Sequence, residues 1–245
     1  MFHYENGLML TRPRLAVDFQ RRQPRGFVSH AHADHMARHE WTLATPETAA
    51  LYRFRLGRQG SPLLRVRELP YHQPFEFSGV QLTTLPAGHC LGSAMLLAEQ
   101  EGEQLLYTGD FKLGESLTAT PADPPRADLL VMESTFGRPE YRLPPRQEVI
   151  AQLIDLVRQC FDEGHTPVIH AYAMGKSQEV TKILTTHGIP VLQHREVFAI
   201  SRVYEECGMQ LSTDDADCCE YAGRPLAGHA VVTLPKSMKR FRLAV

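Results

Sequence analysis

Histidine and aspartate side chains gather in the segment Ser-His-Ala-His-Ala-Asp-His at residues 29–35, directly after the apolar residues 26–28. The apolar segment is typical of a strand end, and a loop that leaves a strand can aim alternate side chains at one point. The candidate ligands are His30, His32, Asp34 and His35. Imidazole and carboxylate suit zinc first and manganese or iron next, because the segment contains no thiolate. Since affinity tags are repetitive and terminal, we interpret this internal, irregular run as a metal site rather than as a surface run of histidines.

Two further segments carry candidate ligands, and both follow predicted strands. His89 lies in a glycine-rich loop at residues 85–93, and Asp110 ends the sequence Leu-Leu-Tyr-Thr-Gly-Asp. Alone, such a histidine is more often structural, and such an aspartate more often forms a turn. Together with the histidine segment, they supply the imidazoles and carboxylates that a two-metal centre requires.

The first half of the chain alternates short apolar segments with turns, which is typical of strands. Strands are expected at residues 8–11, 15–18, 26–28, 80–85, 94–98, 104–108 and 129–133, and a helix at 46–56. The second half shows helical spacing instead. Helices are expected at 146–163, 175–187 and 196–207, and strands at 166–170 and 191–193. This alternation indicates an α/β unit with parallel strands, and the prolines and glycine at residues 134–145 indicate a boundary before it.

Composition limits the classes of protein that fit the chain. With 245 residues and a formal net charge of −2, it has no overall field that attracts nucleic acid. No apolar run approaches the ~20 residues that cross a bilayer, and the N-terminus does not resemble a secretory signal. The five cysteines form no C-x-x-C pair, so we expect a cytoplasmic protein with no membrane partner.

Basic residues cluster locally and are either phosphate contacts or solvated surface charges. The clusters are Arg12, Arg14, Arg21, Arg22 and Arg25 before the histidine segment, and Lys236, Lys239, Arg240 and Arg242 at the other end of the sequence.

The ordered set of candidate ligands, with Asp18 before it, resembles the first four motifs of the metallo-β-lactamase fold. Residues 131–137, Val-Met-Glu-Ser-Thr-Phe-Gly, resemble the acidic motif that opens the β-CASP branch, whose members are DNA and RNA nucleases. Residues 170–179 resemble the strand-to-helix turn of its inserted lobe. The similarity covers nearly the whole chain and points to bacterial ligase-associated DNA exonucleases and related RNA 3′-end processing factors.

This resemblance implies a mixed fold of the α+β or α/β class. Residues 1–137 are expected to form a metallo-β-lactamase αββα sandwich, incomplete in its C-terminal half. Residues 138–245 are expected to form the inserted β-CASP α/β lobe.

The resemblance also implies roles for the candidate residues. One metal ion is expected to be held by His30, His32 and His89, and a second by Asp34 and His35. Asp110 is expected to bridge the two ions, and Asp18 to orient the cluster from outside it. The implied activity is exonucleolytic or endonucleolytic hydrolysis of DNA or RNA through a metal-activated hydroxide. Two divalent ions are expected, with zinc ahead of manganese.

Glu133 is implied to steer a proton to the leaving oxygen, which makes Asp34, Asp110 and Glu133 the catalytic set. The alternative for Glu133 is a strand-end carboxylate that caps the next turn.

The turn Gly175-Lys176-Ser177 follows a predicted strand and opens a predicted helix, so its amides are candidates for contact with a nucleic-acid phosphate. A helix start without a ligand is the second interpretation. ATP binding ranks last, because a P-loop needs G-x-x-x-x-G-K-S and its first glycine position is His170 here.

β-CASP nucleases supply further histidines after the inserted lobe, and one of them is a ligand of the second metal. The later histidine here is His229, which we expect at the start of a strand and not as a ligand. The second metal site is therefore expected to be incomplete, or to be completed by a partner chain or a second copy in a homodimer. A functional link to a DNA ligase is also implied.

Two other functions remain open. Small-molecule hydrolases with the same metal motif cleave thioesters or lactams, but they lack a β-α-β lobe after the acidic motif. With its second metal site unfinished, the chain is alternatively a truncated, inactive nucleic-acid-binding homologue. A metal content near one ion or none would favour that alternative.

Overall fold

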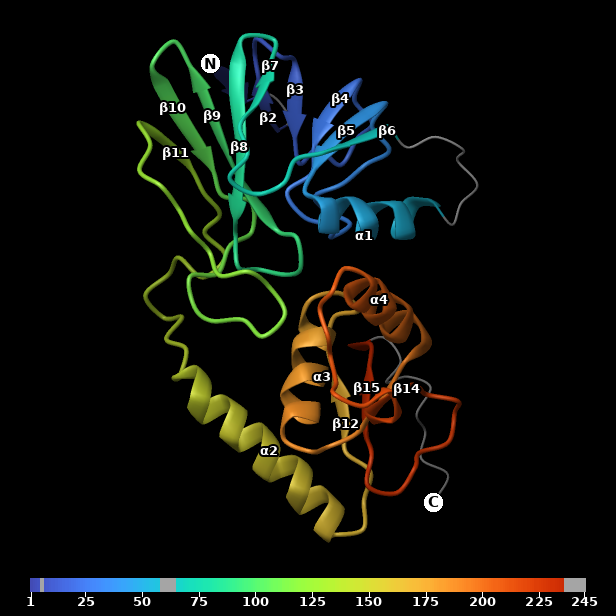
Figure 1. The fold of residues 1–245 in the computed structure, drawn as a ribbon. Coiled ribbons are helices and arrows are strands. Elements are labelled where there is room, and N and C mark those ends of the chain that lie inside the picture. Colours follow the sequence, from blue (N-terminus) through green and yellow to red (C-terminus); the bar gives the residue numbers. More distant parts are fainter. Residues whose placement is uncertain (5–6, 58–64, 236–245) are drawn as a thin grey trace. The chain divides into compact units, whose positions relative to one another are not determined.

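The computed structural model describes residues 1–4, 7–57 and 65–235 (Figure 1). The chain divides into two compact units, Met1–Ser134 and Thr135–Val245, and each unit is described by itself. In the described parts of the chain, no helix is both long and apolar enough to cross a membrane. The basic cluster expected at 236–242 lies outside the described residues.

The first sheet of the first unit has the strand order β1-β2-β3-β4-β5-β6. Its strands are β1 (Phe2–Tyr4), β2 (Leu8–Leu10), β3 (Leu15–Val17), β4 (Arg25–Phe27), β5 (Trp41–Ala44) and β6 (Arg65–Glu68). Pairing is antiparallel from β1 to β3 and parallel from β3 to β6. The helix α1 (Pro46–Gly57) follows β5 and contacts β6. Two parallel strands need such a crossover, because the end of one strand and the start of the next lie at opposite ends of the sheet.

The second sheet of this unit has the order β11-β10-β9-β8-β7. Its strands are β7 (Phe75–Phe77), β8 (Val80–Pro86), β9 (Ala94–Gln100), β10 (Glu103–Tyr107) and β11 (Leu129–Val131). Four of them form an antiparallel meander, and β11 joins β10 in parallel. The meander fits the alternation of apolar and polar residues in this part of the sequence.

One apolar core joins the two sheets. Leu10, Phe27 and Leu43 from the first sheet pack with Leu82 and Leu96 from the second, and each is at most 1% exposed. Burying such a side chain contributes about 1.5 to 3 kcal/mol relative to leaving it exposed. The first unit is therefore a two-sheet sandwich, and its strand ends present the loops that carry the candidate ligands.

The second unit contains an all-parallel sheet of order β12-β15-β13-β14. Its strands are β12 (Val168–His170), β13 (Val191–Gln193), β14 (Cys218–Glu220) and β15 (Ala230–Thr233), with the 3-10 turn η1 (Asp215–Asp217) before β14. The helices are α2 (Arg146–Asp162), α3 (Lys176–Thr186) and α4 (Arg195–Glu206). Apolar residues of all three helices share one core with β13 and β15. His229 directly precedes β15, as expected.

The mixed α/β class predicted from the sequence is confirmed, and so are the parallel strands of the second unit. Sequence analysis missed the strands β1, β5, β6, β7 and β14. All but β5 are edge strands of their sheets. An edge strand is short and often polar, as in Arg-Val-Arg-Glu of β6, and so lacks the apolar alternation that identifies a strand.

Candidate metal centre

Three loops at the ends of strands bring the candidate ligands together. The loop after β4 carries the histidine segment, the loop after β8 carries His89, and Asp110 follows β10. The backbone amide of Ala94 donates a 2.9 Å hydrogen bond to the carbonyl oxygen of Ser29. This bond joins the histidine loop of the first sheet to β9 of the second. The cluster therefore depends on the sandwich having closed.

Gly109 allows the end of β10 to approach the histidine loop. Its φ of +55° lies in the left-handed region, and a Cβ placed on it would lie 2.8 Å from Oγ of Ser29 and 2.9 Å from its Cβ. Real Cβ atoms do not approach other heavy atoms so closely. A glycine at this position therefore permits both the turn and the contact that bring the neighbouring Asp110 to the cluster.

The first donor group consists of His30, His32, His89 and Asp110, whose ligand atoms all lie within 4.8 Å of one another. Nδ1 of His32 is 2.8 Å from Nε2 of His30 and 3.2 Å from Nε2 of His89. Oδ2 of Asp110 is 3.8 Å and 3.7 Å from the same two Nε2 atoms. Zinc bonds of 2.0 to 2.2 Å place tetrahedral ligand atoms about 3.4 Å apart. The donors present fit such an ion in both chemistry and spacing.

Burial favours the neutral imidazole that a metal requires. Burial first, and then the neighbouring imidazoles of His35 and His32, hold the pKa of His30 well below its usual value of 6.5. His30 itself is fully buried. With its proton on Nδ1, which lies 3.0 Å from Oγ of Ser29, the neutral ring has its lone pair on Nε2, the atom that faces the other donors.

The second donor group consists of Asp34, His35 and the other oxygen of Asp110. Nε2 of His35 lies 3.3 Å from Oδ1 of Asp110 and 3.7 Å from Oδ2 of Asp34. The Asp34 side chain is 69% exposed, in contrast to the buried first group. The carboxylate of Asp110 thus presents Oδ2 to the first group and Oδ1 to the second. This is the arrangement through which one carboxylate can bridge two ions.

Asp18 holds the second group from behind. Its two oxygens accept hydrogen bonds from the amide of Ser29 at 2.7 Å, from Oγ of Ser29 at 2.5 Å and from the hydroxyl of Tyr107 at 2.9 Å. Oδ2 of Asp18 also lies 2.9 Å from Nδ1 of His35. A carboxylate only accepts, so Nδ1 of His35 carries the proton and Nε2 is left for a metal.

The pKa values near Asp18 agree with these bonds. Burial lowers the pKa of His35, but the hydrogen bond and charge of Asp18 and the charge of Asp110 outweigh it, so the pKa is raised. Burial, and then the charge of Asp18, raise the pKa of Tyr107, which therefore remains a donor. Burial also raises the pKa of Asp110 against the effect of His35.

Glu133 lines the same cavity as the second donor group. This metal-centre cavity has a volume of about 320 Å³ and is also lined by Asp34, His35 and Asp110. Oε1 of Glu133 accepts a 3.2 Å hydrogen bond from the amide of Phe111. The carboxylate therefore holds the turn after Asp110, and its role as a proton donor to a leaving group stays a prediction.

Sequence analysis missed three residues that hold the cluster in place. Ser29 and Tyr107 bind Asp18, and Arg55 of α1 donates to the carbonyl oxygen of Ala31 between two of the histidines. Ser29 is the first residue of the histidine segment, so its role could have been identified there. Tyr107 lies 89 residues from Asp18 and Arg55 lies 24 residues from Ala31, so no local spacing identifies them.

The turn Gly175-Lys176-Ser177 belongs to the second unit, and its polar groups bind within that unit. The amide of Gly175 donates to the Gln178 side chain at 2.8 Å, and the amides of Lys176 and Ser177 donate to carbonyl oxygens of the same turn. The Lys176 ammonium lies 3.7 Å from Glu179. These amides have partners within the unit, and a phosphate contact at this turn stays a prediction.

A family model described as the beta-lactamase superfamily domain matches residues 25–188, about two thirds of the chain. The match includes all the donors of the two groups. The chain belongs to this superfamily, and its relatives identify the metallo-β-lactamase/β-CASP family within it. The family binds divalent metal ions, and the first donor group is a cluster that can hold one.

Several curated proteins are similar in sequence. A probable DNA ligase of Opitutus terrae is 37% identical over 237 residues, which cover 96% of this chain and 22% of the relative. Cleavage and polyadenylation specificity factor subunit 3 of Dictyostelium discoideum is 32% identical, over 59% of this chain and 19% of the relative. Endoribonuclease YSH1 of Yarrowia lipolytica is 28% identical, over 74% and 26%. The chain thus spans about a quarter or less of the length of these relatives.

Proposed function

We propose that this chain is a metal-dependent phosphodiesterase that cuts nucleic acid. The observation that carries the proposal is the position of Asp110, whose two oxygens face two separate groups of metal donors. Paired ions about 3.5 to 4 Å apart are typical of enzymes that hydrolyse phosphodiesters. The family and the names of its relatives support the same reaction class.

The residues suggest two sites of unequal strength. Zinc is the proposed first ion, with manganese as the alternative, because the donors are imidazoles and carboxylates without a thiolate. The first donor group offers four buried or half-buried side chains. The second donor group offers three, and one of them, Asp34, is mostly exposed. We therefore expect one tightly bound ion at the first group and a more weakly bound ion at the second.

The chemistry divides between the ions and the protein. When bound, divalent ions lower the pKa of water and neutralise charge on the phosphate oxygens. Asp18 keeps His35 in one tautomer and orientation. Asp34 and Glu133 both line the metal-centre cavity, in reach of a bound phosphodiester. We assign to Asp34 the binding of the second ion, and to Glu133 the delivery of a proton to the leaving oxygen.

Nucleic acid is the proposed substrate because of the relatives. Endoribonuclease YSH1 is named for cutting RNA, whereas the relative from Opitutus terrae is named a DNA ligase. We propose that the chain acts on a nucleic-acid strand and is functionally linked to DNA joining. All five cysteines are free, which supports the proposed cytoplasmic location.

Cleavage of end-labelled oligonucleotides tests the proposal. Single-stranded and duplex forms of DNA and RNA are incubated with the purified chain and zinc or manganese. Asp34→Ala removes one donor of the second group, and Arg65→Gln, on the far edge strand β6, is the control. We expect metal-dependent cutting that survives Arg65→Gln and is lost in Asp34→Ala. If the unmodified chain cuts no substrate more than Asp34→Ala does, the proposal is overturned. If it hydrolyses only a thioester or a lactam, a small-molecule hydrolase is favoured.

A further inference from the structure

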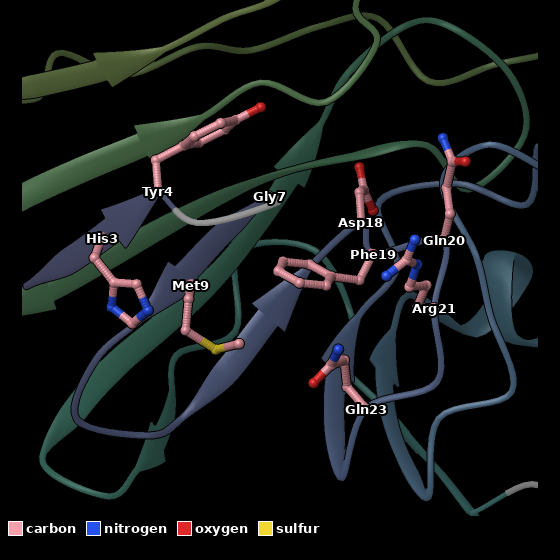
Figure 2. Close-up of a pocket in the computed structure, with 9 residues that line it drawn as sticks. All are labelled: His3, Tyr4, Gly7, Met9, Asp18, Phe19, Gln20, Arg21 and Gln23. Atoms are coloured by element: carbon pink, nitrogen blue, oxygen red, sulfur yellow. The ribbon is translucent and has the colours of Figure 1, made fainter.

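A second cavity, of about 650 Å³, lies beside the metal centre in the first unit (Figure 2). It lies between β1 and β2 on one side and the segment that follows β3 on the other, and we call it the Tyr4 groove. Tyr4, Gly7 and Asp18 line both the Tyr4 groove and the metal-centre cavity. The two cavities are therefore neighbours, and an extended ligand that lies in the groove can reach the metal donors.

An exposed aromatic ring stands where the two cavities adjoin. Tyr4 is 77% exposed, although it is a large and partly apolar side chain. No hydrogen bond or ring contact of Tyr4 is found with any described residue. An unpartnered aromatic face in this position is available for stacking against a planar ligand.

The opposite wall of the Tyr4 groove carries a free cation. Arg21 lines this wall with Gln20 and Gln23, as Figure 2 shows. Nearby arginines are engaged: Arg22 pairs with Glu40 at 3.4 Å, for example. Arg21 is exposed and makes no hydrogen bond or ion pair with the described residues. Its guanidinium can therefore bind an anion without first losing a protein partner.

Among the described residues that line the groove there is one carboxylate, and its oxygens have protein partners. Asp18 is its acidic residue, and both Asp18 oxygens already accept hydrogen bonds from Ser29, His35 and Tyr107. Among the described lining residues, Tyr4 offers an aromatic face, Arg21 a guanidinium, and Gln20 and Gln23 two amides. Single-stranded nucleic acid is bound by this combination, through bases stacked on aromatic rings and phosphates held by arginine.

We propose that the Tyr4 groove binds an unpaired stretch of DNA or RNA and leads it into the metal centre. Tyr4 stacks on a base beside the phosphate that is cut, and Arg21 binds a phosphate further along the strand. The inference rests on the proposed function and names the form of the substrate. A base inside a duplex has both faces covered by its neighbours, so a ring such as that of Tyr4 selects for a single strand or a frayed end.

Binding without cleavage is the test, measured on the full chain in excess chelator by fluorescence anisotropy with labelled oligo(dT), oligo(U) and a blunt duplex. Tyr4→Leu removes the ring and is expected to weaken binding of the single strand about 10-fold, whereas Tyr4→Phe keeps the ring and stays within about twofold of the unmodified chain. Arg21→Gln is expected to reduce the slope of log K against log salt by about 0.7, the value for one phosphate of a single strand. Arg65→Gln, at the opposite edge of the same sheet, is the control and should leave binding unchanged.

Three outcomes would overturn the proposal that the Tyr4 groove binds a single strand. The first is that the single strand binds no more tightly than the blunt duplex. The second is that Tyr4→Leu and Arg21→Gln both bind the single strand as tightly, and with the same salt dependence, as Arg65→Gln. The third is that no oligonucleotide binds. A failure of the proposed function is distinct from these. In that case the unmodified chain with zinc cleaves neither oligonucleotides nor bis(4-nitrophenyl) phosphate, while Tyr4→Leu still loses binding. The groove would then stand as a nucleic-acid site without the reaction.

Discussion

Oδ2 of Asp18 lies 2.9 Å from Nδ1 of His35, while Nε2 of the same ring lies 3.3 Å from Oδ1 of Asp110. One imidazole therefore connects the buried carboxylate behind the centre to the carboxylate shared by both donor groups. The bond to Asp18 fixes which nitrogen of His35 carries the proton. The orientation of the second donor group thus depends on a residue that contacts neither ion position.

Asp18→Asn tests this dependence. An asparagine of the same shape would turn an NH₂ group toward at least one of the donors that now bind the carboxylate. We expect the second zinc to bind about 10 to 100-fold more weakly, with a smaller change at the first site. Calorimetric titration of metal-free protein measures both. Asp155→Asn, exposed on α2 in the second unit, is the control, and equal zinc affinities in the two variants would contradict the role of Asp18.

Gly109→Ala tests the contact that brings Asp110 to the cluster. The left-handed backbone alone costs a non-glycine residue about 1 to 3 kcal/mol, and the clash with Ser29 adds to this cost. Gly102→Ala is a matched control, because Gly102 also has a positive φ but its Cβ would meet nothing within 4 Å.

We expect Gly109→Ala to unfold at lower urea than Gly102→Ala, with a further loss of about 1 to 3 kcal/mol. Weaker zinc binding should appear in Gly109→Ala alone. If both variants lose the same stability and bind zinc equally well, the close approach to Ser29 does not position the centre.

The candidate donors were predictable because their spacing is local. The histidine segment carries four of them within six residues, and Asp110 stands directly after a recognisable strand. The sharing of Asp110 between two groups was implied by family resemblance and not by spacing. The position of Asp110 depends on the contact between Gly109, which follows a strand of the second sheet, and Ser29, which follows a strand of the first.

The residues that sequence analysis missed act through tertiary structure. Tyr107 meets Asp18 only after the two sheets pack together, and Tyr4 lies on an edge strand too short to be recognised. The edge strands β6 and β7 were missed for the same reason, because three or four residues that include polar side chains show little periodicity. The buried interior strands of the second sheet were found, because burial of one face imposes alternation on the sequence.

His39 should make the fold sensitive to acid. It is 3% exposed, its Nδ1 accepts a 3.1 Å hydrogen bond from the amide of Gln23, and burial lowers its pKa to about 4. The unfolded chain has the ordinary value near 6.5. Between these values the unfolded state binds the extra proton, so the stability that neutral His39 contributes is present above pH 6.5 and is lost as the pH falls toward 4.

His39→Gln isolates this effect, because other histidines also titrate. In metal-free protein, the slope of unfolding free energy against pH between 4 and 6.5 should fall by up to about 1.4 kcal/mol per pH unit. Urea unfolding at several pH values measures it. His72→Gln, an exposed histidine, is the control. A slope in His39→Gln equal to that in His72→Gln would show that His39 does not remain neutral in the folded state.

In the proposed reaction, Asp110 would hold two ions whose joint presence is needed to cut a phosphodiester. The most direct measurement is a titration of metal-free chain with zinc, in which bound ions and cleavage of a single-stranded oligonucleotide are determined on the same samples. We predict little cleavage at one ion per chain, a steep rise as the second ion binds, and the loss of both the second ion and the cleavage in Asp110→Asn. Full cleavage at one ion per chain, or cleavage by Asp110→Asn equal to that of the unmodified chain, would contradict a role for Asp110 in holding two ions.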